Sequence, residues 1–578
     1  MFLFQLFRSF LPLHNPIGFG VSDFLEFALA ALLTCLVLGH ARIDPWIRRV
    51  AANTAWCMLF VGGLAVALRL ALLPNFPAPT PSGSDDFAYL LLADTLAHFR
   101  LANQVHPLHQ FFETNFVLQD PAYSSIYPIG PALALAIGQL LLGSPWAGVV
   151  LAIGTFCALC YWMLRAWVPP AWALAGGLLA VIQFSALNYW MNTYWGGAVS
   201  GIAGCMVIGA MPHLREHGGT RNAILLGAGL GLQILSRPYE SIFLDVSVIL
   251  FFLPDLRHPG ERRKLLRLAR PAVLAVIPAL ALLLLHNHAA TGSWTTLPYM
   301  LNRYQHGVPT TFTFQPNPVP HAQLTRSQQI YYEGQAAAHG DAPESIGAYI
   351  GRLAGRAAFY RFFFFPPLYL VLPIFLLTVR EYRFAWVVAT LALFALGSNF
   401  YPYFFSHYIA AAACLFVLVS IEGLRRLSAW TLRGLDVGRE AAVWIIALCG
   451  AHFCFWYGLH AMGAKDLLLA LDRYEVWDAI SFGDPEGRTT VNQELAAQPG
   501  KQLVFVRYSP RHGYQEWIHN AADIDGAPVV WAQDLGPEND QELIRYFHGR
   551  TAWLLEPDAH PPRLTPLGPT SVQMEQVR

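Results

Sequence analysis

The segment from Ser84 to Tyr89 places two adjacent carboxylates, Asp85 and Asp86, close to an aromatic hydroxyl group. It follows a long apolar run and a short proline-rich stretch. A carboxylate held at a membrane surface can act as a general base and take a proton from a hydroxyl group. The same acids also suit the first turn of a helix, where they cap backbone amides and interact favourably with the helix dipole. The sequence leaves both roles open.

Arg237 is the second group with clear chemical potential, because it stands between two apolar runs that contain almost no other charge. Its guanidinium could form an ion pair with Glu240 or with an acid of the first loop. It could instead bind a lipid phosphate in a fork geometry. The predicted catalytic residues are Asp85 and Asp86, and the predicted substrate-binding residues are Tyr89, His106, Tyr127, Asn192, Tyr194, Arg237, His407 and Tyr408.

The loop that follows Asp85 and Asp86 contains three residues whose spacing resembles that of a metal site. His106, His109 and Glu113 would lie on one face of a helix. Pro107 argues against a continuous helix there, so we expect these side chains to form hydrogen bonds within a loop. No metal ligands are assigned, and a divalent metal ion is the one cofactor that the sequence leaves open.

The composition identifies the kind of protein that must position these groups. Of the 578 residues, 55% are hydrophobic and only 13% are charged, whereas a soluble domain carries roughly a quarter charged residues. Apolar runs of about 17 to 22 residues recur, long enough to cross a bilayer. The formal net charge is zero, so no nucleic acid partner is indicated. We predict an all-α polytopic membrane protein with twelve spans, near 22–40, 54–73, 146–166, 171–190, 195–212, 221–236, 238–254, 271–288, 361–379, 384–398, 401–421 and 441–461.

The basic residues predict the orientation of these spans, since loops rich in Arg and Lys stay on the cytoplasmic side. The loop 255–270 is the most basic. All basic loops fall inside only if the short segment 128–143 is a surface or re-entrant helix on the outer side. Both termini and the loops 75–145 and 289–360 then lie outside. The N-terminal stretch lacks the charge and cleavage pattern of a signal peptide.

All eight cysteines fall inside apolar runs, so we predict no structural disulfide. Cys157 and Cys160 have the spacing of a redox motif, but no charged residue flanks them, and packing is the better explanation.

The chain changes character after about residue 462. Strands are predicted at 503–506, 528–531 and 551–555, and a helix at 538–547. This pattern indicates a small α/β domain that serves as a scaffold or contacts an acceptor. The predicted divisions are residues 1–53 as an additional span with its loop, 54–462 as the main membrane domain and 463–578 as the C-terminal domain.

The order of motifs resembles the GT-C superfamily of membrane glycosyltransferases, and in particular the protein O-mannosyltransferases and lipid A aminoarabinose transferases. The resemblance covers roughly residues 54–422, and no single motif in it is specific. The matching segments are Asp85 to Tyr89, which resembles an Asp-Glu-x-x-Tyr motif, Tyr127 to Pro131 with its short helix ending at Gly143, Gly227 to Pro238, and His407-Tyr408.

The chain departs from the family pattern at two places. Ile126 and Tyr127 occupy the position where some relatives carry Lys, and the turn from Asn192 to Trp195 lacks the Asp of metal-dependent relatives. The second departure argues against a metal requirement.

The resemblance implies an inverting transfer of a hexosyl or pentosyl group from a polyprenyl-phosphate donor to an acceptor hydroxyl on a glycan, lipid or protein. Asp85 would be the base, Arg237 would stabilise the departing phosphate, and Asp86 and Tyr89 would orient Asp85 or the sugar. The expected location is the inner membrane of a bacterial cell, with the large loops and C-terminal domain outside the cytoplasm. A flippase of lipid-linked sugars and a non-catalytic glycan-binding protein are the alternatives.

Overall fold

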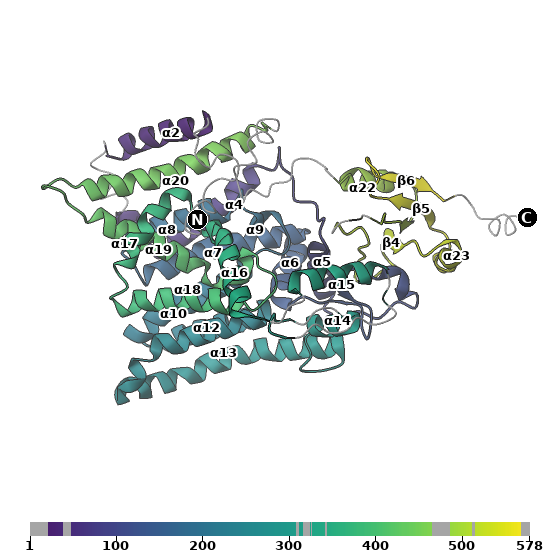
Figure 1. Ribbon diagram of the computed structural model, residues 1–578, viewed down its shortest axis with the longest axis horizontal. Coiled ribbons are helices and arrows are strands. Elements are labelled where there is room, and N and C mark those ends of the chain that lie inside the picture. The colour runs from purple at the N-terminus through teal and green to yellow at the C-terminus, as the bar shows by residue number, and fades with distance from the viewer. Residues whose placement is uncertain are drawn as a thin grey trace, which may run out of the picture.

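The computed structural model describes residues 21–38, 48–307, 311–315, 324, 326–340, 344–464, 486–510, 512 and 515–567. The stretch without a signal-peptide pattern before residue 21, and the segment 465–485 at the start of the predicted C-terminal domain, lie outside these residues. The described chain is mostly helical. In Figure 1 the long helices run side by side, with α5 (Ser84–Ala97), α14 (Pro298–His306) and α15 (Arg326–His339) at one end of them and a β-sheet beyond.

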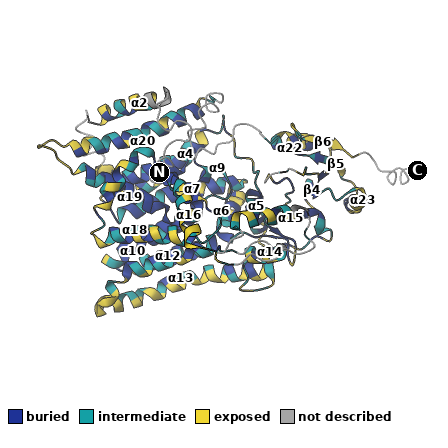
Figure 2. Ribbon diagram, in the orientation of Figure 1, coloured by how far each residue is buried: buried dark blue, intermediate teal, exposed yellow. Residues whose placement is uncertain are grey.

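Six described helices are long and apolar enough to cross a membrane. They are α4 (Thr54–Ala71), α7 (Pro145–Arg165), α10 (Ala198–Glu216), α13 (Pro259–Thr291), the run of η5 (Ser406–Ala412) with α19 (Ala413–Ser428), and α20 (Val437–Ala461). Figure 2 shows exposed residues along α13, which suits contact with lipid. The finding supports a membrane protein.

The predicted number of twelve spans is not reached by this criterion. Two helical segments, 346–363 and 366–376, meet at a bend of 109° and together would make a seventh span. The first consists of α16 (Ile346–Arg356) and η3 (Ala357–Phe363), and the second of η4 (Pro366–Val371) and α17 (Leu372–Leu376). The other predicted spans correspond to helices of 15 to 18 residues. These are α2 (Val21–Leu38), α8 (Pro170–Phe184), α11 (Thr220–Ser236), α12 (Pro238–Phe252) and α18 (Tyr382–Ser398). A helix of 15 residues is only about 22 Å long, which is short for a membrane span. Twelve spans stay a prediction.

The short helix α6 (Ile129–Leu142) occupies the segment that we expected to lie at the outer surface. Its 14 residues are too few for a span. The helix is capped by Gly143, a residue without a side chain that readily adopts the left-handed φ of 70° found there. Gly130 brings α6 close to the end of α11, because a Cβ there would lie 2.6 Å from the Ser236 hydroxyl. The first loop and the turn that carries Arg237 therefore pack directly together.

The C-terminal segment forms a four-stranded sheet in the order β4-β3-β5-β6. The central strand β3 is fully buried and pairs in parallel with β4 and β5, and β6 is antiparallel to β5. Three strands and one helix lie close to the segments predicted from sequence, while α22 and β6 were not predicted. The elements are α22 (Arg488–Ala496), β3 (Gln502–Val506), β4 (Val529–Gln533), α23 (Pro537–Tyr546), β5 (Thr551–Glu556) and β6 (Arg563–Pro566).

The sheet packs on the loop that carries the paired acids. Phe111 and Phe112 of η1 (His109–Phe112) share a buried apolar cluster with Leu503 and Phe505 of β3. The Ala522 N–H donates to the Asp94 carboxylate at 2.7 Å. The same loop contains a small hairpin of β1 (Val117–Leu118) and β2 (Ser124–Ser125). The remaining described elements are α9 (Tyr189–Asn192) and η2 (Asp255–Arg257).

All eight cysteines are free, as predicted.

Candidate functional site

The two adjacent aspartates have different surroundings. Asp86 is buried, with 6% of its surface exposed. Its Oδ2 accepts hydrogen bonds from the backbone N–H groups of Ser82 and Gly83 at 3.3 and 3.4 Å, and its Oδ1 accepts one from Tyr194 N–H at 3.0 Å. Burial raises the pKa of Asp86 to about 6. These contacts favour a capping role for Asp86 over the predicted catalytic role, because both oxygens already serve the backbone.

Asp85 remains partly exposed and meets side chains instead of backbone. The Tyr127 hydroxyl donates a hydrogen bond to its Oδ1. The Tyr127 ring in turn stacks on Tyr89, with centroids 4.3 Å apart and planes 9° apart. Burial raises the pKa of Asp85, and the Tyr127 hydrogen bond and the charge of Arg237 act in the opposite direction. A carboxylate of raised pKa that stays partly open is suited to take up a proton.

Arg237 lies at the junction of α11 and α12, and its charge lowers the pKa of Asp85. Its Nη1 lies 3.3 Å from Glu240 Oε1, so the ion pair considered from the sequence is present. The guanidinium carbon lies 4.4 Å from the ring centroid of Tyr408. No other acceptor for this guanidinium occurs among the described residues, which leaves Nε and Nη2 for a ligand. Arg237, Glu240 and Tyr408 thus form one wall of the site.

A second arginine, which the sequence did not single out, lies on α14. Arg303 is only 4% exposed and packs over the Tyr299 ring at 4.9 Å. Its Nη2 lies 3.3 Å from Gln335 Oε1, but Nε and Nη1 have no partner among the described residues. Tyr299 also bonds through its hydroxyl to Tyr401, which follows α18. Arg303 is one of four arginines in the predicted outer loop 289–360, so its residue type alone did not mark it.

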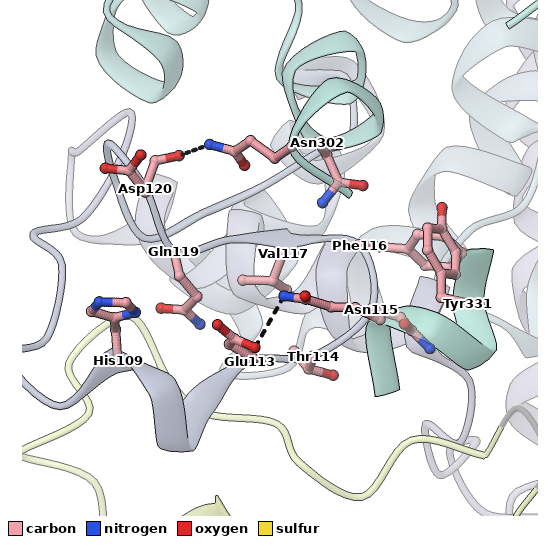
Figure 3. Close-up of a pocket in the computed structure, with 12 residues that line it drawn as sticks. His109, Glu113, Thr114, Asn115, Phe116, Val117, Gln119, Asp120, Asn302 and Tyr331 are labelled. Atoms are coloured by element: carbon pink, nitrogen blue, oxygen red, sulfur yellow. Dashed lines mark hydrogen bonds between the residues drawn. The ribbon is translucent and has the colours of Figure 1, made fainter. Parts of the chain in front are cut away.

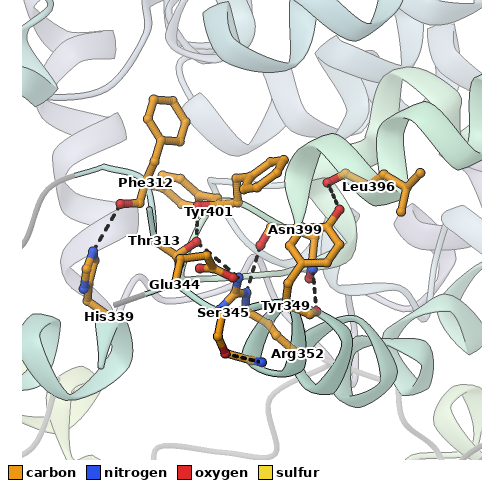
Figure 4. A network of polar contacts seen from close by, with 12 residues as sticks. Phe312, Thr313, His339, Glu344, Ser345, Tyr349, Arg352, Leu396, Asn399 and Tyr401 are labelled. Atoms are coloured by element: carbon orange, nitrogen blue, oxygen red, sulfur yellow. Dashed lines mark hydrogen bonds and ion pairs between the residues drawn. The ribbon is translucent and has the colours of Figure 1, made fainter. Parts of the chain in front are cut away.

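The turn that supplies Tyr401 and Tyr408 is anchored by a polar network on the outer loop (Figure 4). Arg352 on α16 bonds to both oxygens of Glu344, at 2.7 and 2.9 Å. Its Nε donates to the Asn399 carbonyl at 2.8 Å. Arg356, one turn later, donates to the Ser398 carbonyl at 2.8 Å and also to Tyr401 O. The loop 289–360 therefore positions the tyrosines of the site.

Asn192 and Tyr194 support the site from behind. The Arg69 Nε donates to Asn192 Oδ1 at 2.8 Å, and the Asn192 amide donates to two backbone carbonyls. Arg69 also holds the Phe76 and Pro77 carbonyls at 3.0 and 2.9 Å. Tyr194 gives its N–H to Asp86 and its hydroxyl to the Pro79 carbonyl at 2.9 Å. These bonds favour a scaffolding role over the predicted substrate binding.

The two predicted histidines occupy different places. His106 lies against the C-terminal sheet, with Nε2 3.2 Å from Asp525 and Nδ1 accepting the Leu108 N–H at 2.9 Å. Both ring nitrogens are used, which argues against substrate binding. His407 is buried beside Tyr408, and its Nδ1 lies 3.2 Å from the Tyr189 hydroxyl. His407 contacts Tyr408, which in turn packs on Arg237. Among the described residues it makes no contact with Asp85.

No group of three or more His, Cys, Asp or Glu side chains gathers as a metal-binding cluster within the part of the chain that the structure describes. His106, His109 and Glu113 do not form such a group.

Comparison with known proteins gives similarity at the level of structure. No protein-family model matches the chain, and no curated protein matches it. ArnT from Cupriavidus metallidurans bound to undecaprenyl phosphate is similar over 87% of this chain and 93% of its own, at 12% identity and a TM-score of 0.48. The oligosaccharyltransferase of Archaeoglobus fulgidus, in complex with zinc and sulfate, is similar over 78% of this chain and 60% of its own, at 12% identity and a TM-score of 0.42.

Proposed function

We propose that this chain is a glycosyltransferase that moves a sugar from a polyprenyl-phosphate donor to an acceptor hydroxyl at the outer face of the membrane. The observation that carries the proposal is the Asp85 carboxylate, which is partly exposed, bonded to Tyr127 and within range of the charge of Arg237. The donor class follows from the resemblance of the sequence motifs to GT-C enzymes. We also propose that the sugar is a hexose or a pentose.

Asp85 is the general base of the proposed reaction. The acceptor oxygen attacks the anomeric carbon, the bond from that carbon to the phosphate oxygen breaks, and the acceptor proton passes to Asp85. The products are the glycosylated acceptor and the polyprenyl phosphate, and the anomeric configuration is inverted because one displacement occurs. The Tyr127 hydroxyl holds the carboxylate in place through its hydrogen bond.

The two arginines account for the charge of the leaving phosphate. Arg237 offers Nε and Nη2, and Arg303 offers Nε and Nη1, as described above. A guanidinium in a water-poor site stabilises developing negative charge more strongly than it does in water. Glu240 holds Arg237 in position through their ion pair. The negative charge of Glu240 also offsets the positive charge of Arg237 before the donor binds.

The proposed setting follows the predicted topology. The loops 75–145 and 289–360 and the C-terminal domain 463–578 face outward from the inner membrane of a bacterial cell, and the donor enters sideways between spans of the domain 54–462. The Tyr194 N–H binds Asp86 at the start of α5, and Asn192 accepts a hydrogen bond from Arg69. Tyr89 stacks against Tyr127, and Tyr408, beside His407, packs on Arg237.

The test is incubation of the purified protein with a panel of radiolabelled polyprenyl-phosphate monosaccharides and an envelope extract as acceptor. We expect label to leave one donor and enter the extract, and the Asp85→Asn variant to show no such transfer. Tight binding of a donor without transfer of its label by the unaltered protein would contradict the proposal and favour a carrier of lipid-linked sugars.

A further inference from the structure

A polar pocket opens on the outer loops beside the site. It encloses about 240 Å³ between the loop 109–120, α14 and α15. Figure 3 shows side chains from all three segments turned toward it. None of the roles assigned above uses this pocket.

The wall of the pocket contains buried polar atoms that the described protein does not satisfy. Both polar atoms of the Asn302 side chain lack a partner, although the residue is only 1% exposed. Three more buried atoms lack a partner among the described residues: His109 Nδ1, Thr114 Oγ1 and Gln119 Oε1. A buried polar atom without a hydrogen bond costs about 1–3 kcal/mol, and native folds keep few of them. Five such atoms around one pocket indicate that it holds something polar.

The lining identifies the chemistry of that occupant. It is rich in carboxamides, which both donate and accept hydrogen bonds, as sugar hydroxyls do. The two aromatic rings of the lining suit the apolar face of a sugar ring. Among the described residues that line the pocket there is no lysine or arginine, the side chains that most often bind a phosphate. The carboxamides are Asn115, Gln119, Asn302, Gln305 and Gln328, and the aromatic residues are Phe116 and Tyr331.

The two acids of the lining do not make the pocket a cation site. Glu113 Oε2 accepts a hydrogen bond from Gln328 at 3.0 Å, and Asp120 is exposed. An uncharged occupant fits this arrangement better than a cation or an anion.

The pocket shares a wall with the Asp85 site. The Phe116 ring meets the Tyr127 ring edge to face with centroids 5.7 Å apart, and it meets the Tyr331 ring at 5.5 Å. Tyr127 carries the hydrogen bond to Asp85. The rings of Phe116 and Tyr127 therefore link the pocket to the proposed base.

We propose that this pocket binds a single uncharged sugar ring and delivers it to the Asp85 site. Its volume lies below the roughly 300–1,000 Å³ typical of drug-sized ligands, which suits one ring and not a longer glycan. The ring is either the sugar of the donor or a terminal sugar of the acceptor. Its place in transfer rests on the proposed function, while the binding itself does not require turnover.

Binding is tested by saturation-transfer NMR on the full chain in detergent, with the methyl glycosides of neutral hexoses and pentoses as probes and glucuronate and glucosamine as charged controls. We expect a neutral glycoside to bind. Asn302→Leu should weaken that binding at least about fivefold and keep the fold, because it replaces a group without protein partners by an apolar one of similar size. Thr390→Val, which alters another buried and unpartnered polar group on α18, should bind like the unaltered protein.

The inference is overturned if no neutral glycoside binds, if Asn302→Leu leaves binding unchanged, or if a charged sugar binds in preference. Asp85→Asn should keep the binding, so a protein that binds sugar but transfers none would contradict the proposed function alone. The source of the ring is read from the transfer reaction of Asn302→Leu. A raised KM for the donor assigns the pocket to the donor sugar, and a raised KM for the acceptor assigns it to the acceptor.

Discussion

At the scale of single residues, the central feature is the divergence of Asp85 and Asp86. Adjacent residues on a helix point about 100° apart, so one carboxylate turns back to the amides before α5 and the other turns toward Tyr127. The chain thus uses one acid to build the helix start and keeps its neighbour for the site.

This divergence predicts unequal effects of two matched substitutions on stability. Asp86→Asn should lower the free energy of unfolding by about 1–3 kcal/mol, because an amide cannot replace a carboxylate that accepts three backbone hydrogen bonds. Asp85→Asn should be close to neutral, since burial already disfavours its charge. Thermal unfolding in detergent measures both, and equal losses would contradict the assignment.

The Tyr127 hydroxyl should set the pH at which Asp85 works. Asp85 must be ionised to act as a base, so the rate of transfer should rise with pH through its pKa. Burial raises that pKa and the Tyr127 hydrogen bond lowers it. Tyr127→Phe should therefore move the acidic limb of the pH–rate profile to higher pH. Tyr123→Phe, whose hydroxyl bonds to the Asn520 carbonyl instead, should leave the limb in place.

At the scale of elements, the junction of α11 and α12 places an ion pair at the site. Arg237→Gln should destabilise the protein by about 3 kcal/mol, because it leaves Glu240 buried without its partner. The double variant Arg237→Gln with Glu240→Gln should recover most of that stability and still fail to transfer. Unfolding midpoints and transfer rates together separate the two effects.

A control for this pair lies between the end of α10 and η2, away from the α11 and α12 junction. Arg215 and Asp255 form an ion pair of 2.8 Å in which neither side chain is fully buried. The double variant Arg215→Gln with Asp255→Asn should keep transfer. Transfer by the Arg237 and Glu240 double variant would mean that Arg237 serves only its ion pair.

Local elements were predictable from the sequence because their signals are local. The start of α5 and the short helix α6 follow from capping residues, proline and glycine, and the strands of the tail follow from apolar runs. The partners of Asn192 and Tyr194 were not predictable, since they reach Arg69 and Asp86 across more than 100 residues of chain. Arg303 was missed for the same reason, because only folding brings its loop to the site.

At the scale of the whole molecule, the account requires the outer loops and the C-terminal sheet to share one side of the membrane. Their contacts with each other agree with this, since His106, Asp94 and Glu113 all bond to the C-terminal segment. The basic start of α13 should lie on the opposite side.

Cysteine labelling tests this orientation. After replacement of the exposed Cys35 and Cys454 by serine, a cysteine at the exposed position of Glu333 or Glu542 should react with an impermeant reagent added to intact cells. A cysteine at Gly260 should react only after lysis. Gly340 is less suited to a probe, because its φ of 86° disfavours any side chain. Labelling of Gly260→Cys in intact cells would contradict the topology.

The measurement that tests the central claim most directly is the single-turnover rate of sugar transfer by Asp85→Asn, beside Asp86→Asn at a temperature where both are folded. The account predicts that Asp85→Asn loses roughly 10²–10⁴-fold in rate, the usual contribution of a general base. Asp86→Asn should stay within about tenfold of the unaltered protein, because its role is to hold the helix. A fast Asp85→Asn variant, or a loss confined to Asp86→Asn, would contradict Asp85 as the base.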